Sequence, residues 1–364
     1  MAGVTISLVF SENGIIAKAR EAAEKTNQAV VNEQEEMNKV ADYMSNMVNG
    51  TGGSTPEEPE DPTANWDLNK VNKVESTDGV VVPVPKGYIA SSIAIESTVS
   101  DGFVIYEGEE AVNEENKKTA QATRNQFVWV PVENPSEMYG TDSNGKNVIS
   151  LIDLEDIREP DIVTRYDGND ATYDASEFIP IIGNITGKQF KTQLENEFNS
   201  MIESIEKYEG FYIGRYETGN LSQTEVAVVK NNTDINNQTW YTQYNKAKGI
   251  AANSNVTTTM IWGCQWDAVL RWMYNSGDAE KKTYICNSTG KGNYKDTNGN
   301  QTIATGSNDL YAVNNIYDMA GNVYDWTIET RNAYGRVIRG GCYYETSITS
   351  VSYRNNGTPS MPRH

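Results

Sequence analysis

Asn314–Trp326, which reads NNIYDMAGNVYDW, is the most informative segment of the chain. It places two carboxylates, Asp318 and Asp325, seven residues apart around the central Ala320-Gly321-Asn322. Glycine is unfavourable at the centre of a helix, and a simple turn does not need both acids. The segment therefore predicts a loop that holds a metal ion or a ligand, or that is held only by its own contacts.

The charge and the histidine content exclude several classes of function. The chain has 364 residues and a formal net charge of -20, which argues against nucleic acid as a partner because phosphate binding needs a basic surface. An acidic surface suits a secreted or surface-exposed protein, although many cytosolic proteins share it. The single histidine is His364, so we expect no Ser-His-Asp triad, no Cys-His pair and no histidine metal site in the folded body.

The three cysteines, Cys264, Cys286 and Cys342, are widely spaced and form no CxxC motif. We therefore expect no zinc site. Three buried thiols, or one disulfide with a free thiol, are both compatible with this spacing.

Composition divides the chain into three parts. In residues 1–48, apolar residues between Val30 and Val48 recur at three- and four-residue steps, which predicts an amphipathic helix over about 12–48. Residues 49–65 are rich in Gly, Pro and acids and predict a solvated linker. Residues 66–364 form the third part. No apolar run reaches the roughly 18 residues that a membrane span needs.

Beyond the linker, short runs of β-branched and aromatic residues predict strands at 79–85, 102–108, 126–132 and 209–219. Helices are predicted at 189–207, about 242–252 and 265–275. The rest is rich in Asn, Gly, Thr and Asp, so we expect one α+β domain with few strands and long loops. Loops of this length usually need bound cations or a function to fix them.

Four segments resemble, in order, the signature segments of the formylglycine-generating-enzyme (sulfatase-modifying-factor) superfamily. They are FVWVPV at 127–132, GFYIGRYE at 210–217, NNIYDMAGNVYDW at 314–326 and RVIRGG at 336–341. The resemblance covers roughly residues 126–354. It implies a C-type-lectin-like fold, with a small twisted sheet and two helices within irregular structure. Members usually continue with a further strand that closes the sheet. We expect either that the chain is truncated before this strand, or that the domain lacks it and leaves a sheet edge open.

The resemblance also implies a calcium ion bound by the segment around Gly321. Carried over to this chain, the side chains of Asp318 and Asp325 and the backbone carbonyls of Gly321 and Val323 would be its ligands. Calcium takes six to eight hard oxygen ligands, and two converging carboxylates without a cation would repel each other. The alternative is that the segment is only a turn with Trp326 in the core.

Enzymes of this superfamily oxidise a cysteine through a copper ion held by two thiolates. The two positions fall here on Glu345 and Ser350, while Arg354 is retained. Cu(I) selects sulfur ligands, so a carboxylate and a hydroxyl are poor substitutes. We therefore expect a calcium-binding scaffold that has lost copper and the oxidase activity, since function does not follow from fold.

The C-terminal stretch combines Tyr with Ser, Asn and Gly, the mixture that binding loops use. In the superfamily, the matching stretch lines the ligand face. Some members are variable proteins of diversity-generating retroelements, and the residue types of this stretch are similar to those at their variable positions. The candidate ligand-binding residues are Tyr334, Tyr343, Tyr344, Glu345, Ser347, Thr349, Ser352, Tyr353, Asn355 and Asn356.

The first residues resemble the end of a type IV pilin-like helix whose upstream membrane half is missing. These features together predict a binding protein displayed outside the cell, on a bacterial surface, with an unidentified protein or carbohydrate ligand. Contact with a membrane would be made only through the missing upstream helix, and Met37–Met47 could pair helices in an assembly. The alternatives are a formylglycine-generating copper oxidoreductase and a structural pilin subunit.

Overall fold

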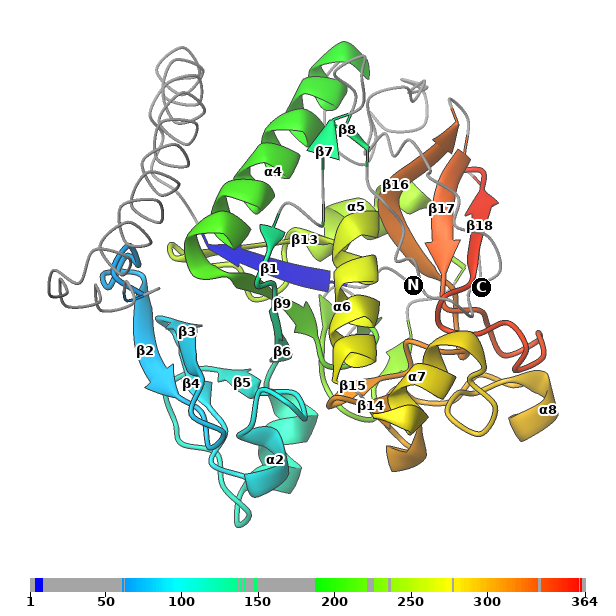
Figure 1. The fold of residues 1–364 in the computed structure, drawn as a ribbon. Coiled ribbons are helices and arrows are strands. Elements are labelled where there is room, and N and C mark those ends of the chain that lie inside the picture. Colours follow the sequence, from blue (N-terminus) through cyan, green and yellow to red (C-terminus); the bar gives the residue numbers. More distant parts are fainter. Residues whose placement is uncertain are drawn as a thin grey trace, which may run out of the picture. The chain divides into compact units, whose positions relative to one another are not determined.

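Antiparallel strands are the framework of the computed structural model, which describes residues 4–8, 61, 63–135, 138, 140–141, 147–148, 187–220, 226–234, 237–276, 278–332, 335–359 and 361. Six strands form the main sheet in the order β13-β1-β9-β6-β5-β4 (Figure 1). Their bounds are β1 Val4–Leu8, β4 Tyr88–Ala90, β5 Val104–Glu107, β6 Gln126–Pro131, β9 Gly210–Gly214 and β13 Val256–Met260.

Smaller sheets surround the main one, and a three-stranded sheet is made of β16 Asp325–Asn332, β17 Gly335–Arg339 and β18 Arg354–Gly357. The other strands pair as β2 Val71–Glu75 with β3 Val81–Pro85, β7 Gly140–Thr141 with β8 Asn147–Val148, β10 Gly219–Asn220 with β11 Val226–Ala227 and β12 Thr233–Asp234, and β14 Ala312–Val313 with β15 Ile316–Tyr317.

Helices in the described ranges are α2 Lys117–Thr123, α4 Gly187–Tyr208, α5 Trp240–Ala247, α6 Gly263–Asn275, α7 Ala279–Cys286 and α8 Lys295–Asn298, with the short 3-10 helices η1 Ala94–Glu96 and η3 Asp309–Tyr311. The chain is therefore a mixed α+β protein, as its sequence predicted. None of these helices combines the length and the hydropathy that crossing a bilayer requires.

The central strands form where apolar runs were expected. β6 and β9 are almost completely buried and pair in register, with Trp129 opposite Tyr212 and their rings 4.9 Å apart. Strands buried on both faces read as continuous apolar runs instead of alternating ones, which explains both sequences. The strands expected at 79–85, 102–108, 126–132 and 209–219 are confirmed as β3, β5, β6 and β9.

The N-terminal strand was not expected. Val4–Leu8 had been assigned with residues 1–48 to a helical segment, but it forms β1, which pairs with β13 on one side and β9 on the other. Thr5 is completely buried, and its hydroxyl meets Thr259 Oγ1 and Gln265 Oε1, both at 3.1 Å. Residues 4–8 thus belong with residues from 66 onward to one compact unit, in which β1 is paired along both of its edges. The helix expected over 12–48 lies outside the described residues, as does nearly all of the linker.

The three expected helices are confirmed as α4, α5 and α6, although α5 begins and ends earlier than expected. α4 is amphipathic, and its buried face carries residues spaced by three or four positions that pack near β1 and β9. Those residues are Phe190, Leu194, Phe198, Met201, Ile205 and Tyr208.

The three cysteines are free thiols, and no disulfide links them. Cys264 and Cys342 are buried, while Cys286 is partly exposed. The expectation of three buried thiols is therefore correct for two of them.

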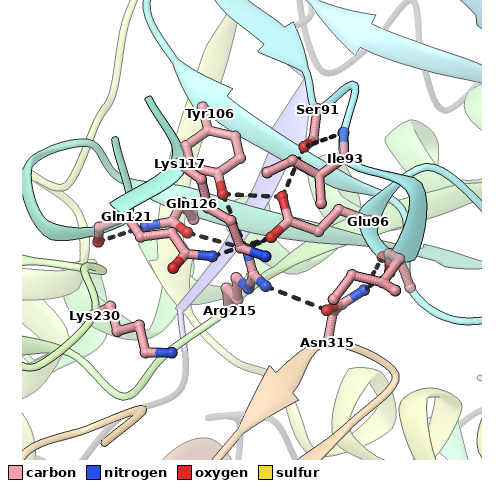
Figure 2. A network of polar contacts seen from close by, with 12 residues as sticks. Ser91, Ile93, Glu96, Tyr106, Lys117, Gln121, Gln126, Arg215, Lys230 and Asn315 are labelled. Atoms are coloured by element: carbon pink, nitrogen blue, oxygen red, sulfur yellow. Dashed lines mark hydrogen bonds and ion pairs between the residues drawn. The ribbon is translucent and has the colours of Figure 1, made fainter. Parts of the chain in front are cut away.

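A buried ion pair joins distant parts of the main sheet. Arg215 Nη1 lies 2.8 Å from Glu96 Oε1, and both side chains are almost inaccessible to solvent. The same nitrogen donates to the Tyr106 hydroxyl and Gln126 Oε1, while Arg215 Nη2 donates to Asn315 Oδ1 (Figure 2). Burial raises the pKa of Glu96, but the charge of Arg215 and hydrogen bonds to the carboxylate outweigh it, so the net pKa is lowered.

We expect Glu96→Gln to lower the free energy of unfolding by about 3–5 kcal/mol, because it leaves the Arg215 charge buried without a partner. The double variant Glu96→Leu with Arg215→Met should recover a large part of this loss, since it removes both charges. Urea denaturation of the wild type and the two variants measures both effects. A single variant as stable as the wild type would contradict the assignment.

Candidate functional site

The segment Asn314–Tyr324 is held by the residues that follow β9. The Asn315 side chain accepts from Arg215, and Tyr317 N–H donates to the Arg215 carbonyl at 2.8 Å. The rings of Tyr216 and Tyr317 lie 4.9 Å apart. Two of the segments singled out by sequence, around 210–217 and 314–326, are therefore parts of one structural unit.

Asn322 is the centre of this unit, a role that sequence reasoning missed. Its side chain is completely buried. Its Oδ1 accepts from Asn293 Nδ2 at 2.9 Å and from Ile303 N–H at 3.0 Å, and its Nδ2 donates to Glu217 Oε2. The loop thus closes around a neutral amide whose donors and acceptor are matched by three other segments.

Gly321 is required by a close approach of two backbones. Its φ is +80°, and a Cβ at this position would lie 2.5 Å from the carbonyl oxygen of Asn293. Asn322 N–H donates to that same carbonyl, and Gly321 N–H donates to Gly340 O, both at 2.8 Å. The close approach of the two backbones therefore explains why residue 321 is glycine, without a bound cation.

Asp318 is a fully buried carboxylate with half of its hydrogen-bonding capacity used. Oδ2 accepts from Gly306 N–H at 2.7 Å and from the Thr305 hydroxyl at 3.1 Å. Oδ1 is buried and has no hydrogen-bond partner among the described residues. Burial raises the pKa of Asp318 to about 6, against the two hydrogen bonds, which lower it.

Asp325 is also buried, at the start of β16 and opposite Arg339 of β17. Asp318 and Asp325 both lie close enough to the Tyr284 hydroxyl to add to the rise in its pKa, of which burial is the main cause. The Tyr284 hydroxyl has no hydrogen-bond partner in the described part of the chain. The two acids therefore flank one buried polar region.

These residues fit a hard cation only with help from the backbone. Within the described ranges, no three His, Cys, Asp or Glu side chains come together in a cluster that could hold a metal. The predicted set of Asp318, Asp325 and the carbonyls of Gly321 and Val323 supplies oxygen atoms alone, which is the donor type that calcium prefers. A bound cation would give Asp318 Oδ1 the partner that the described residues do not supply.

A tyrosine cluster lies at the surface on the C-terminal side of this loop. The Tyr324 ring is 5.9 Å from Tyr344 and 6.4 Å from Tyr353, and Tyr343 is 5.2 Å from Tyr344. Tyr344 is 40 % exposed, Tyr343 and Tyr353 are partly exposed, and Tyr324 is buried. We call these four residues the tyrosine face. Three of them were expected, while Tyr324 was missed because its segment had been interpreted only as a metal loop.

Other candidate ligand residues adjoin the tyrosine face. Glu345 lies beside Tyr324, and burial raises the pKa of its carboxyl. Its Oε2 is buried and has no partner within hydrogen-bond geometry among the described residues. Asn355 Nδ2 donates to the Tyr353 hydroxyl at 2.6 Å, and Asn356 follows in β18. Ser352 meets the Ser350 hydroxyl at 2.9 Å.

Two candidates have structural roles instead. Ser347 is buried, and its hydroxyl and N–H both donate to the Asp296 carboxylate. Thr349 is partly exposed, but its carbonyl accepts from the Tyr294 hydroxyl, which fixes the backbone. Tyr334 lies outside the described residues.

Comparison with known proteins finds no matching family model, no matching curated protein and no matching solved structure. The interpretation of the site therefore depends on its own geometry and chemistry.

The pH dependence of stability tests whether a cation satisfies Asp318. Without a cation, the folded protein holds this proton up to about pH 6 and the unfolded chain only to about 3.8, so stability falls as pH rises between these values. Above about pH 6, ionisation of buried Asp318 lowers the free energy of unfolding by its full amount, on the order of 3 kcal/mol. Calcium bound at Asp318 would remove this fall.

We therefore expect calcium to raise the melting temperature at pH 7.5, and EDTA to reverse the rise. Asp318→Asn should abolish the response to calcium. In EDTA it should be at least as stable as the wild type, because it removes the charge. Differential scanning calorimetry at pH 5 and pH 7.5 measures all of these effects. If calcium leaves the wild type unchanged at both pH values, the segment is only a turn.

Proposed function

We propose that this chain is a ligand-binding protein that uses the tyrosine face, carried on a C-type-lectin-like scaffold of the formylglycine-generating-enzyme type. The observation that supports it best is the gathering of four tyrosine rings from two separate segments into one partly exposed cluster. A tyrosine ring supplies contact area and a hydrogen-bonding tip at little entropic cost. The ligand is a protein or a carbohydrate at the exterior of the cell.

The manner in which the face is supported favours this proposal. Tyr343 N–H donates to the carbonyl of Asn322, and Lys295 N–H donates to the carbonyl of Glu345, both at 2.9 Å. The Tyr294 hydroxyl donates to the carbonyls of Gly340 and Thr349. The segment is thus held largely by its backbone, so its exposed side chains are available for binding and their replacement costs little stability.

The same feature supports diversification of the C-terminal stretch by a retroelement. A backbone-held segment can accept many side chains without unfolding, which a diversified receptor needs. Display on a bacterial surface through the N-terminal segment, and a calcium ion in the loop around Gly321, complete the proposal. Enzymatic chemistry at Glu345 and Ser350 is not part of it.

We expect the double variant Tyr343→Ala with Tyr344→Ala to weaken ligand capture by about tenfold or more, since central aromatic residues dominate binding energies. Its melting temperature should stay close to that of the wild type because both rings are partly exposed. Binding to glycan and surface-protein arrays, read beside calorimetry, measures both quantities. Tyr274→Ala, which changes a partly exposed tyrosine outside the face, is the matched control. A large loss of stability with unchanged capture would assign the rings to the core.

Sibling genes from one strain provide a second test. We expect their differences to concentrate at Tyr343, Tyr344, Ser352, Tyr353 and Asn355. Buried residues of the same stretch should stay constant, because they have packing or hydrogen-bonding roles; they include Gly340, Gly341, Cys342, Ser347, Ser350 and Val351. Differences spread evenly over the whole chain would contradict diversification while leaving the binding function open to the first test.

A further inference from the structure

We infer that a cavity beside helix α4 is a second binding site, specific for a neutral saccharide of one or two rings. The cavity has a volume of about 480 Å³ and lies among α4, the residues after α5 and strand β13. It shares no lining residue with the tyrosine face or with the loop around Gly321. Its size lies within the range of about 300–1,000 Å³ that is typical of small-molecule sites.

The cavity reaches the outer edge of the main sheet. Three successive residues of β13, Thr257, Thr258 and Thr259, line it. Successive side chains of a strand point to opposite faces, so a cavity bounded by all three extends to the edge of the strand. β13 is the terminal strand of the described sheet, next to β1 (Figure 1). The site is therefore an opening at the edge of the sheet instead of a packing defect in its interior.

Polar side chains of α4 that open onto the cavity supply the strongest sign of a ligand. Asn196 and Ser200 both line the cavity and both are exposed, so a bound molecule can reach their amide and hydroxyl groups. Thr258 also lines the cavity, but its hydroxyl is covered by its neighbours, so other atoms of this residue face the ligand.

The charged groups of the cavity neutralise each other. Lys248 Nζ lies 2.5 Å from Glu197 Oε1, and the Tyr244 hydroxyl lies within 2.9 Å of both carboxylate oxygens. Gln193 Nε2 donates to the same network. Among the described lining residues this pair leaves no net charge, so neither an anion nor a cation is favoured.

The remaining wall offers uncharged donors and acceptors beside small apolar surfaces. Asn196 and Ser200 contribute an amide and a hydroxyl, while Met201 and Ala252 contribute apolar contacts. A sugar hydroxyl both donates and accepts, which matches amides and hydroxyls of either polarity, and the C–H surface of a sugar ring matches the apolar contacts. A purely apolar ligand would leave these polar groups without partners.

Saturation-transfer NMR on the full chain with maltose, lactose and chitobiose at millimolar concentration tests the inference. We expect at least one of them to bind saturably. Asn196→Trp, on the exposed rim of the cavity, should abolish this binding. Asn199→Trp places the same ring on an exposed α4 position that does not line the cavity, and it should bind like the wild type.

Ser200→Ala distinguishes a ligand contact from a structural role. It removes the hydroxyl of an exposed helix residue that lines the cavity, so the melting temperature should stay the same or rise. The affinity for the saccharide should fall by about three- to tenfold, the equivalent of one hydrogen bond. The inference is overturned if none of the three sugars binds, if Asn196→Trp and Asn199→Trp bind equally well, or if the capped peptide Ac-Ala-Thr-Ala-Thr-NH₂ binds in the cavity and the sugars do not.

Discussion

The ion pair between Glu96 and Arg215 is the constraint on which the rest of the structure depends. Both groups are buried, and removing charges from water is costly unless their partners are held in good geometry. Tyr106, Gln126 and Asn315 supply the additional hydrogen bonds that Arg215 needs. Any arrangement that separated the end of β9 from η1 would leave an isolated charge in the interior. The ion pair and these hydrogen bonds therefore hold the guanidinium group of Arg215 in one position.

From Arg215 the constraint passes by direct contacts to the tyrosine face. The carbonyl of Arg215 accepts from Tyr317 N–H, and Glu217, two residues further along, accepts from the side chain of Asn322. The carbonyl of Asn322 in turn accepts from Tyr343 N–H. Each step joins segments that are far apart in sequence. A loop of this length is therefore fixed by its own polar contacts, whether or not a cation adds to them.

The sequence predicted the parts of the fold that have local causes. Continuous apolar runs identified β6 and β9, and three- and four-residue spacing identified α4. Strand β1 could not be found this way, because its five residues include buried Thr5, whose partners Thr259 and Gln265 lie about 250 residues away. The two carboxylates around Gly321 led to the prediction of a metal site. The neutral Asn322, which closes the loop, lies in no sequence pattern that indicates its role.

The tyrosine face and the cavity beside α4 are held in place by different kinds of contact. Tyr343, Tyr344 and Tyr353 lie on a segment that is held by backbone hydrogen bonds, so these three side chains can be exchanged at little cost to the scaffold, whereas Tyr324 is buried. A protein that must recognise changing targets benefits from this separation. The cavity is built from side chains, among them the network of Glu197, Lys248 and Tyr244, so exchanging its residues changes its shape. A site of that kind suits one unchanging small ligand. In the proposed function, the same scaffold would therefore combine an exchangeable surface with a constant cavity, because the two depend on different atoms.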